Sequence, residues 1–123
     1  SITNSGSFVT ISSGSGANTI TNSGDNVSIS AGDGIGNDSI SNSGTNTTYI
    51  FGANSGADTI TGFNQATDLI RVAVSGTSVS FALNENDNLV ATIGSTTVLL
   101  EGISTGSVNY KIADGDIQTF TIA

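Results

Sequence analysis

The chain has 123 residues and a formal net charge of −8 at pH 7, with Arg71 and Lys111 as its two cations. Nucleic acids and anionic lipid surfaces attract basic proteins, so this charge argues against either partner. Cysteine and histidine are absent, which leaves no disulfide, no thiol nucleophile and no imidazole base. No apolar run approaches the ~20 residues of a membrane span. We therefore expect no enzyme, no nucleic-acid partner and no membrane insertion.

An internal repeat occupies the first half of the sequence. Its period is marked by apolar residues in register, at spacings of 18, 20 and 20: Ile2, Ile20, Ile40 and Ile60. The tripeptide NSG also recurs once per repeat, and each copy precedes a strand-like segment: FVTIS, NVSIS or TTYIF. Each unit thus contains two short strands and two turns. Because strand side chains alternate between faces, one coil offers a thin apolar layer that stacking makes continuous.

The pattern changes after residue 66, where the repeat stops. Six runs then read as ordinary antiparallel strands, at 68–74, 78–83, 88–93, 96–103, 108–112 and 116–123. Short turns between them are compatible with hairpins. The sequence therefore predicts an all-β fold: a short parallel β-roll or β-solenoid of about three coils (1–66), followed by an antiparallel sheet or sandwich cap (67–123). Four residues are predicted to join the two parts: Phe63, Leu69, Ile70 and Phe81.

Three segments share a glycine-rich nonapeptide pattern: SGSGANTIT (13–21), DGIGNDSIS (33–41) and ANSGADTIT (53–61). They resemble the repeat G-G-x-G-x-D-x-U-x of the RTX (hemolysin-type calcium-binding) proteins, in which U is a large apolar residue. The resemblance covers about residues 1–72 by motif and continues more loosely to the C-terminus. The double glycine is missing throughout, so the repeats are degenerate.

The resemblance implies that Ca²⁺ binds between stacked coils, with carboxylate oxygens from the sixth position and carbonyl oxygens from the turns. Carried over, the side-chain ligands are Asp38 and Asp58, with Asn18 as a weaker neutral substitute. The other candidates are carbonyls of Gly34, Gly36, Asn54 and Gly56, the extra acid Asp33, and Asp68 at a terminal site. The alternative is turn chemistry, in which these aspartates bind nearby backbone amides. Two stacked carboxylates ~5 Å apart repel each other without a cation.

The opposite edge of the predicted solenoid departs from the RTX pattern. Its sixth positions are Val9, Val27 and Thr47, which are poor calcium ligands. Asn4, Asn22 and Asn42 are expected to lie one above another there, and stacked amides can hydrogen-bond along the stack. This edge should hold without ions. The acids in NENDN (84–88) and ADGD (113–116) are interpreted as solvated turn residues, with a metal site as the lesser alternative.

Three functions are compatible with this sequence. The favoured one is a secreted, extracellular or cell-surface structural protein that associates with itself head to tail, because nothing in the sequence caps the coil of Ile2. Since the sequence begins at Ser1, we also expect it to be a piece of a longer protein. The resemblance implies a second possibility, the C-terminal secretion and folding module of a type I-secreted bacterial protein. The third is an adhesive face for glycan or ice, formed by Thr19, Ser39 and Thr59 with Thr21, Ser41 and Thr61.

Overall fold

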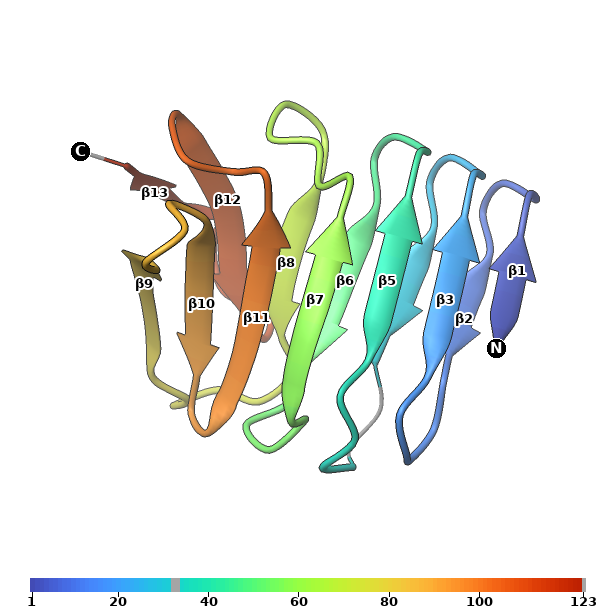
Figure 1. The fold of residues 1–123 in the computed structure, drawn as a ribbon, viewed down its shortest axis with the longest axis horizontal. Coiled ribbons are helices and arrows are strands. Elements are labelled where there is room, and N and C mark those ends of the chain that lie inside the picture. Colours follow the sequence, from blue (N-terminus) through green and yellow to red (C-terminus); the bar gives the residue numbers. More distant parts are fainter. Residues whose placement is uncertain (32–33, 123) are drawn as a thin grey trace.

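The computed structural model describes residues 1–31 and 34–122, and these residues form strands and turns without a helix (Figure 1). One sheet runs β1 (Ile2–Asn4), β3 (Thr19–Asn22), β5 (Ser39–Asn42), β7 (Ala57–Thr61), β11 (Thr96–Glu101), β10 (Leu89–Ile93) and β9 (Val79–Leu83). The other runs β13 (Gln118–Thr121), β12 (Ser107–Ile112), β8 (Leu69–Val72), β6 (Thr48–Phe51), β4 (Ser28–Ser30) and β2 (Thr10–Ser12). The predicted all-β solenoid with an antiparallel continuation is confirmed.

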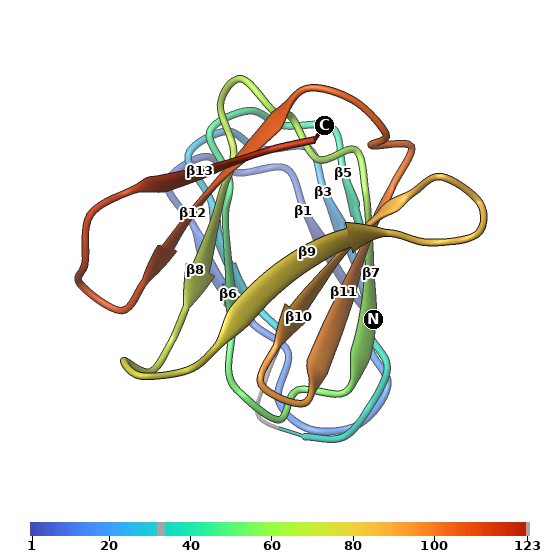
Figure 2. The same ribbon diagram turned by 90° about the vertical axis from the view of Figure 1, so that its left-hand side faces the viewer.

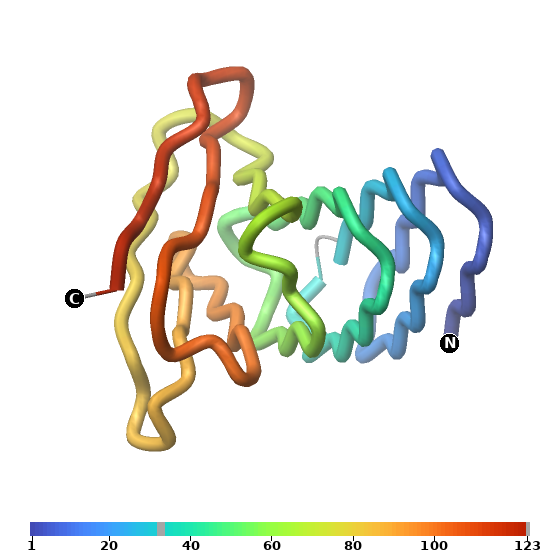
Figure 3. Tube along the Cα trace, turned by 90° about the horizontal axis from the view of Figure 1, so that it is seen from above, coloured from blue at the N-terminus to red at the C-terminus, as the bar shows by residue number. Residues whose placement is uncertain are grey.

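The repeat of the sequence becomes a stack of parallel coils, each with one strand in either sheet (Figure 3). Ile2, Ile20, Ile40 and Ile60 pair in register along β1, β3, β5 and β7. Their side chains point between the sheets, and Ile20, Ile40 and Ile60 are at most 1% exposed. Each such burial contributes about 1.5–3 kcal/mol. A single layer of apolar side chains between two sheets thus holds the coils together.

Three strands of the second half run parallel to the coils, where the sequence analysis expected antiparallel strands. β8 pairs with β6, β12 pairs with β8, and β11 pairs with β7, all in parallel. Alternation of apolar and polar residues fixes which face of a strand is buried, but it carries no information about strand direction. Parallel pairing also satisfies the backbone groups that would otherwise be open on β6 and β7. The antiparallel strands are β9, β10 and β13.

The C-terminal end of the stack is covered by β9 and β13 (Figure 2). Phe81 of β9 lies against Tyr110 and Phe120, at ring-centroid distances of 5.0 Å and 4.8 Å. Of the predicted joining residues, Phe63 and Ile70 are buried and Phe81 is half-buried in this cap. The predicted joining role of Leu69 is wrong: Leu69 pairs in register with Thr48 on the outer face of the sheet, while Ile70 takes the inner position. The division at residue 66 stays a prediction, and one apolar core cluster runs from Ile11 to Val108.

Candidate functional site

The turns that precede β3, β5 and β7 form one long edge of the solenoid, which we call the acidic edge. Asn18 and Asp38 come directly before β3 and β5, and Asp58 is the second residue of β7. The three are brought together at this edge, one from each coil, as the sequence predicts. Asp38 and Asp58 are 3% and 2% exposed. Carboxylates are seldom this deeply buried unless something pairs with them. The acidic edge is therefore the first place to look for a ligand.

Each carboxylate on the acidic edge serves the coil before it. The backbone amide of Asn18 donates to Oδ1 of Asp38 at 2.7 Å, and that of Asp38 donates to Oδ1 of Asp58 at 2.8 Å. These amides come just before the first residues paired in β3 and β5. The aspartates thus do bind backbone amides, but across coils and not within their own turns. This inter-coil role is absent from the sequence-based interpretation.

Asp58 retains one oxygen without a hydrogen bond. Among the described residues no donor reaches its Oδ2, which is fully buried. Burial raises the pKa of Asp58 to about 6; the amide of Asp38 opposes this shift, and the Asp38 carboxylate adds to it. Ionised Asp58 is consequently costly in the fold as it stands, and a cation at Oδ2 would relieve that cost.

The turn backbones of the acidic edge lie in close contact. A Cβ at Gly36 would lie 2.1 Å from the Gly16 carbonyl carbon, and one at Gly56 would lie 2.4 Å from the Gly36 carbonyl oxygen. Gly56 also has a φ of +84°, in the left-handed region that favours glycine. Backbone carbonyls of Gly16 and Gly36 are therefore packed against the next turn of the same edge.

These oxygens fit a hard cation in type. Ca²⁺ takes 6–8 oxygen ligands and accepts backbone carbonyls among them. In residues 1–31 and 34–122, no group of three or more acidic, histidine or cysteine side chains converges. A cation here would rest on the two aspartates and on carbonyls, and the orphaned Oδ2 of Asp58 is the observation that favours it.

The remaining predicted ligands have other surroundings. The side-chain Nδ2 of Asn18 donates to the Gly16 carbonyl at 2.9 Å, and the side-chain Oδ1 of Asn54 accepts from the Ser95 hydroxyl at 3.3 Å. Gly34 lies against Ser15 of the preceding turn. Asp33 lies outside the described residues.

Asp68 lies on the opposite edge, apart from the other two buried aspartates. Its Oδ1 accepts from the Thr47 amide at 2.9 Å, and its Oδ2 accepts from the Asn64 amide at 2.8 Å. Burial raises the pKa of this carboxyl, and those two amides lower it. Asp68 thus accepts a hydrogen bond from the Thr47 amide of the preceding coil, as Asp38 does from the Asn18 amide. Its place after Val9, Val27 and Thr47 in the repeat is a signal that could have revealed this role.

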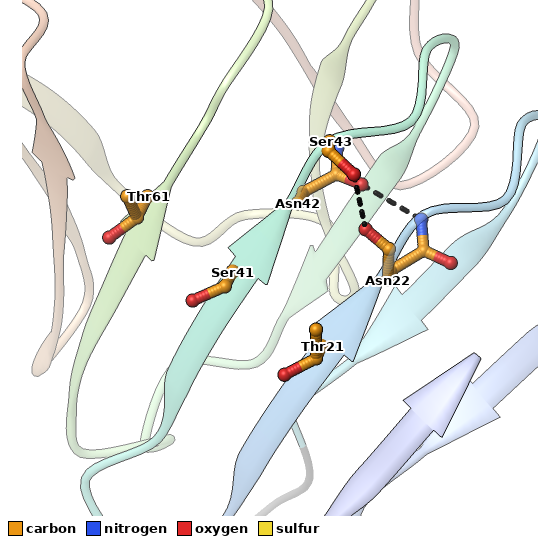
Figure 4. Close-up of a pocket in the computed structure, with 6 residues that line it drawn as sticks. All are labelled: Thr21, Asn22, Ser41, Asn42, Ser43 and Thr61. Carbon is orange, nitrogen blue, oxygen red and sulfur yellow. Dashed lines mark hydrogen bonds between the residues drawn. The ribbon is translucent and has the colours of Figure 1, made fainter. Parts of the chain in front are cut away.

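The opposite edge, which we call the asparagine edge, carries the predicted amide ladder. Asn4 Nδ2 donates to Asn22 Oδ1 at 2.8 Å. In the next step, which Figure 4 shows, Asn22 Nδ2 donates to Asn42 Oδ1 at 2.8 Å. Each amide also closes its own turn, as Asn22 does by accepting from the Gly24 amide at 3.2 Å. The ladder ends at Asn42, whose Nδ2 donates to the Thr47 hydroxyl at 3.1 Å. This prediction is confirmed.

Thr96 of β11 and Ser55 are both buried and join β11 to the acidic edge. Neither contact was predicted from the sequence. The Thr96 hydroxyl accepts from the Ser55 amide at 2.7 Å and donates to the Gly52 carbonyl at 2.8 Å. In the same pairing Val98 comes into register with Asp58, so an apolar residue ends the acidic stack. No local sequence motif predicts these contacts, because they depend on the parallel pairing of β11 with β7.

Hydroxyl side chains form in-register ranks on the outer face of the first sheet. Thr21, Ser41 and Thr61 pair along β3, β5 and β7, and with Asn22, Asn42 and Ser43 they line a shallow concavity of about 260 Å³ (Figure 4). Thr61 donates to the Glu101 carboxylate at 3.1 Å. The concavity follows the direction of stacking, so Thr21, Ser41 and Thr61 place one hydroxyl per coil along it.

The fold and both edges define the chain as a β-solenoid protein whose coils are tied by buried asparagine and aspartate side chains. No protein-family model matches the chain, and no curated protein gives a match either. Within the described part of the chain, no helix is long and apolar enough to cross a membrane.

Proposed function

We propose that the chain is a secreted, extracellular structural protein of the RTX type, whose coils are stabilised by Ca²⁺ on the acidic edge. The observation that carries this proposal is the buried pair Asp38 and Asp58, in which one oxygen of Asp58 has no hydrogen-bond donor. With ten acidic residues and two cations, Arg71 and Lys111, the sequence provides few side chains that could neutralise the pair. A divalent ion is the simplest partner that neutralises both carboxylates at once.

In this proposal the side chains of Asp38 and Asp58 hold the ion, and turn carbonyls of Gly34, Gly36, Asn54 and Gly56 complete the oxygen set. The ion supplies positive charge between coils. The Oδ1 atoms keep their hydrogen bonds to the preceding coil, so calcium adds to the existing stack and does not replace its contacts. The folded chain should therefore be more stable in calcium than without it.

The test is thermal unfolding in excess EGTA and in millimolar Ca²⁺, with Mg²⁺ as the control cation. We expect Ca²⁺ to raise the melting temperature, and Mg²⁺ to do so less because it demands near-ideal octahedral geometry. Asp58→Asn keeps the Oδ1 acceptor and should abolish the calcium response. Asp68→Asn, at the other edge, should lower stability yet keep that response. An equal melting temperature in EGTA and Ca²⁺ would refute the proposal.

All the side-chain roles described above are structural, and for this reason we propose no enzymatic activity. The secretion-module alternative stays a prediction, since no contact in the fold bears on export. Fusing residues 74–123 to a reporter and measuring type I export tests it, and export of the reporter would support this alternative.

The hydroxyl-lined concavity favours one second candidate, an adhesive face for glycan or ice. Sugar hydroxyls and ordered water both pair with a regular array of donors and acceptors. The ranks of Thr21, Ser41 and Thr61 supply such an array at the repeat of the coils. Binding on a glycan array, or thermal hysteresis, that is lost in Ser41→Ala with Thr21→Val would support this function. Retention of binding in the double variant would contradict it.

A further inference from the structure

The two strands at the N-terminal end of the stack, β1 and β2, are edge strands of their sheets. With Gly6, which follows β1, they form what we call the N-terminal face; this is the N-terminal end of the tube in Figure 3. Ile2 and Val9 pack against the core but are only half-buried, whereas their counterparts Ile20 and Val27 are at most 1% exposed. The first coil thus differs from the next ones in lacking, among the described residues, a coil on its outer side.

The asparagine ladder gives this face a direction. In each step the Nδ2 of one coil donates to the Oδ1 of the following coil. Asn22 Oδ1 accepts from both Asn4 and Gly24, whereas Asn4 Oδ1 accepts from Gly6 alone among the described residues. The N-terminal face therefore offers an acceptor at the site where a preceding coil would place an amide donor.

Gly6 also differs from the equivalent glycines of the next coils in the room around it. A Cβ at Gly24 would lie 1.9 Å from the Gly6 carbonyl oxygen, and one at Gly44 would lie 2.0 Å from that of Gly24. At Gly6 the nearest atom is a side-chain carbon of Val9, at 3.3 Å, and its φ is outside the left-handed region. Nothing within the first coil requires glycine there. A neighbouring carbonyl stacked on the face would require it.

Phe8, at the rim of the face, is 83% exposed and has a φ of +60°. Asn26 and Asn46 hold the same repeat position at φ values of +58° and +56°, and asparagine tolerates this conformation better than phenylalanine does. A bulky ring in a strained, solvated turn gains nothing from the coil that carries it. Burial against a neighbour would make it favourable.

We infer that the N-terminal face is a docking surface for a further β-solenoid coil, parallel to β1 and β2, with an asparagine over Asn4 and a glycine carbonyl over Gly6. This inference deepens the structural role proposed above and rests on it, but not on calcium. A symmetric face-to-face dimer fits poorly because it would oppose the two Asn4 acceptors. The C-terminal end of a second copy offers no asparagine, since Gly62 follows Asn42 in the stack.

The test adds such a coil to the complete chain. Residues 19–38 placed directly before Ser1 continue the repeat, because Ser1 and Ile2 then stand where Ser39 and Ile40 follow residue 38. We expect hydrogen exchange of the β1 and β2 amides to slow by about tenfold or more, in EGTA as well as in calcium. A fusion of the same 20 residues in scrambled order should leave these amides unprotected.

Gly6→Ala distinguishes docking in register from general stabilisation. In the unfused chain this substitution should leave the melting temperature unchanged, while in the fused protein it should lower it as Gly24→Ala does. Unchanged exchange of β1 and β2 in the fusion, or an equal effect of Gly6→Ala in both proteins, would overturn the inference. So would a face-to-face dimer of the unfused chain, seen by sedimentation together with protection of the same amides.

Discussion

The two edges of this solenoid solve one problem with different chemistry. At both edges the chain turns, and the turn amides and carbonyls need partners from the neighbouring coil. On the asparagine edge each asparagine of the ladder donates and accepts, so Asn22 bonds to Asn4, to Asn42 and to its own turn. On the acidic edge the carboxylates only accept, and they carry like charges one coil apart.

A ladder of amides is satisfied by its own hydrogen bonds and needs no bound ion. A neutral amide propagates its hydrogen bonds along the stack, and no charge accumulates. A carboxylate makes a stronger bond to the preceding amide but leaves Oδ2 of Asp58 without a partner. We therefore expect the asparagine edge to respond to packing changes and the acidic edge to respond to pH and cations.

The largest effect should come from Gly44→Ala on the asparagine edge. Its Cβ would lie 2.0 Å from the backbone oxygen of Gly24, so the two coils would have to separate. We expect the free energy of unfolding to fall by about 4 kcal/mol, measured by denaturant titration. Gly6→Ala changes the same repeat position without a coil above it, and should cost almost nothing. Equal losses in the two variants would show that the strain is local to the turn.

Asn22→Ala should be the next most damaging change. The variant leaves the Asn4 and Asn42 amide groups and the Gly24 backbone without their partner in a buried setting. We expect a loss of about 3 kcal/mol, the same in EGTA and in calcium. Asn4→Ala, at the half-exposed end, should lose less. If the loss of unfolding free energy in Asn22→Ala differed between EGTA and calcium, the two edges would not be independent in their response to cations.

On the acidic edge, pH should act through Asp58. Its pKa rises from 3.8 to about 6 on folding, so the folded chain binds the proton more tightly than the unfolded one. Stability therefore falls as the pH rises through this window. In EGTA, we expect the wild type to be more stable at pH 5 than at pH 7 by about 1 kcal/mol beyond Asp58→Asn. Identical pH profiles for the two proteins would contradict this role.

The smallest effect is expected at Asp114, an acid outside both edges. It pairs with Arg71 at 3.4 Å, but its side chain is 99% exposed. Solvated ion pairs of this kind contribute little. Asp114→Ala should leave the melting temperature and its calcium response unchanged by calorimetry. If Asp114→Ala also changed the calcium response of the melting temperature, then loss of any negative charge would have the effect expected for Asp58→Asn.

Much of the first half could be read from the sequence because the repeat is local. The spacing of the isoleucines gave the register of the coils, and the recurrent NSG gave the amide ladder, since identical turns stack identically. Asp38 and Asp58 lie one coil apart on the same edge, as the repeat predicts, while their role as calcium ligands stays a prediction. The hydrogen bonds of their Oδ1 atoms to the preceding coil were not foreseen, because the motif names the residues of a turn and not the neighbour that each one contacts.

From the repeat alone follow the alternation of buried and exposed residues, the coil period, and the stacking of the asparagines at one edge and of Asp38 and Asp58 at the other. Tertiary pairing was needed to show that β8, β11 and β12 continue the parallel stack, and that Thr96 and Val98 of β11 lie against the last turn and the last aspartate of the acidic edge. The physical reason is that a two-residue alternation is the same in either strand direction, whereas open backbone groups on β6 and β7 are satisfied by whichever strand reaches them.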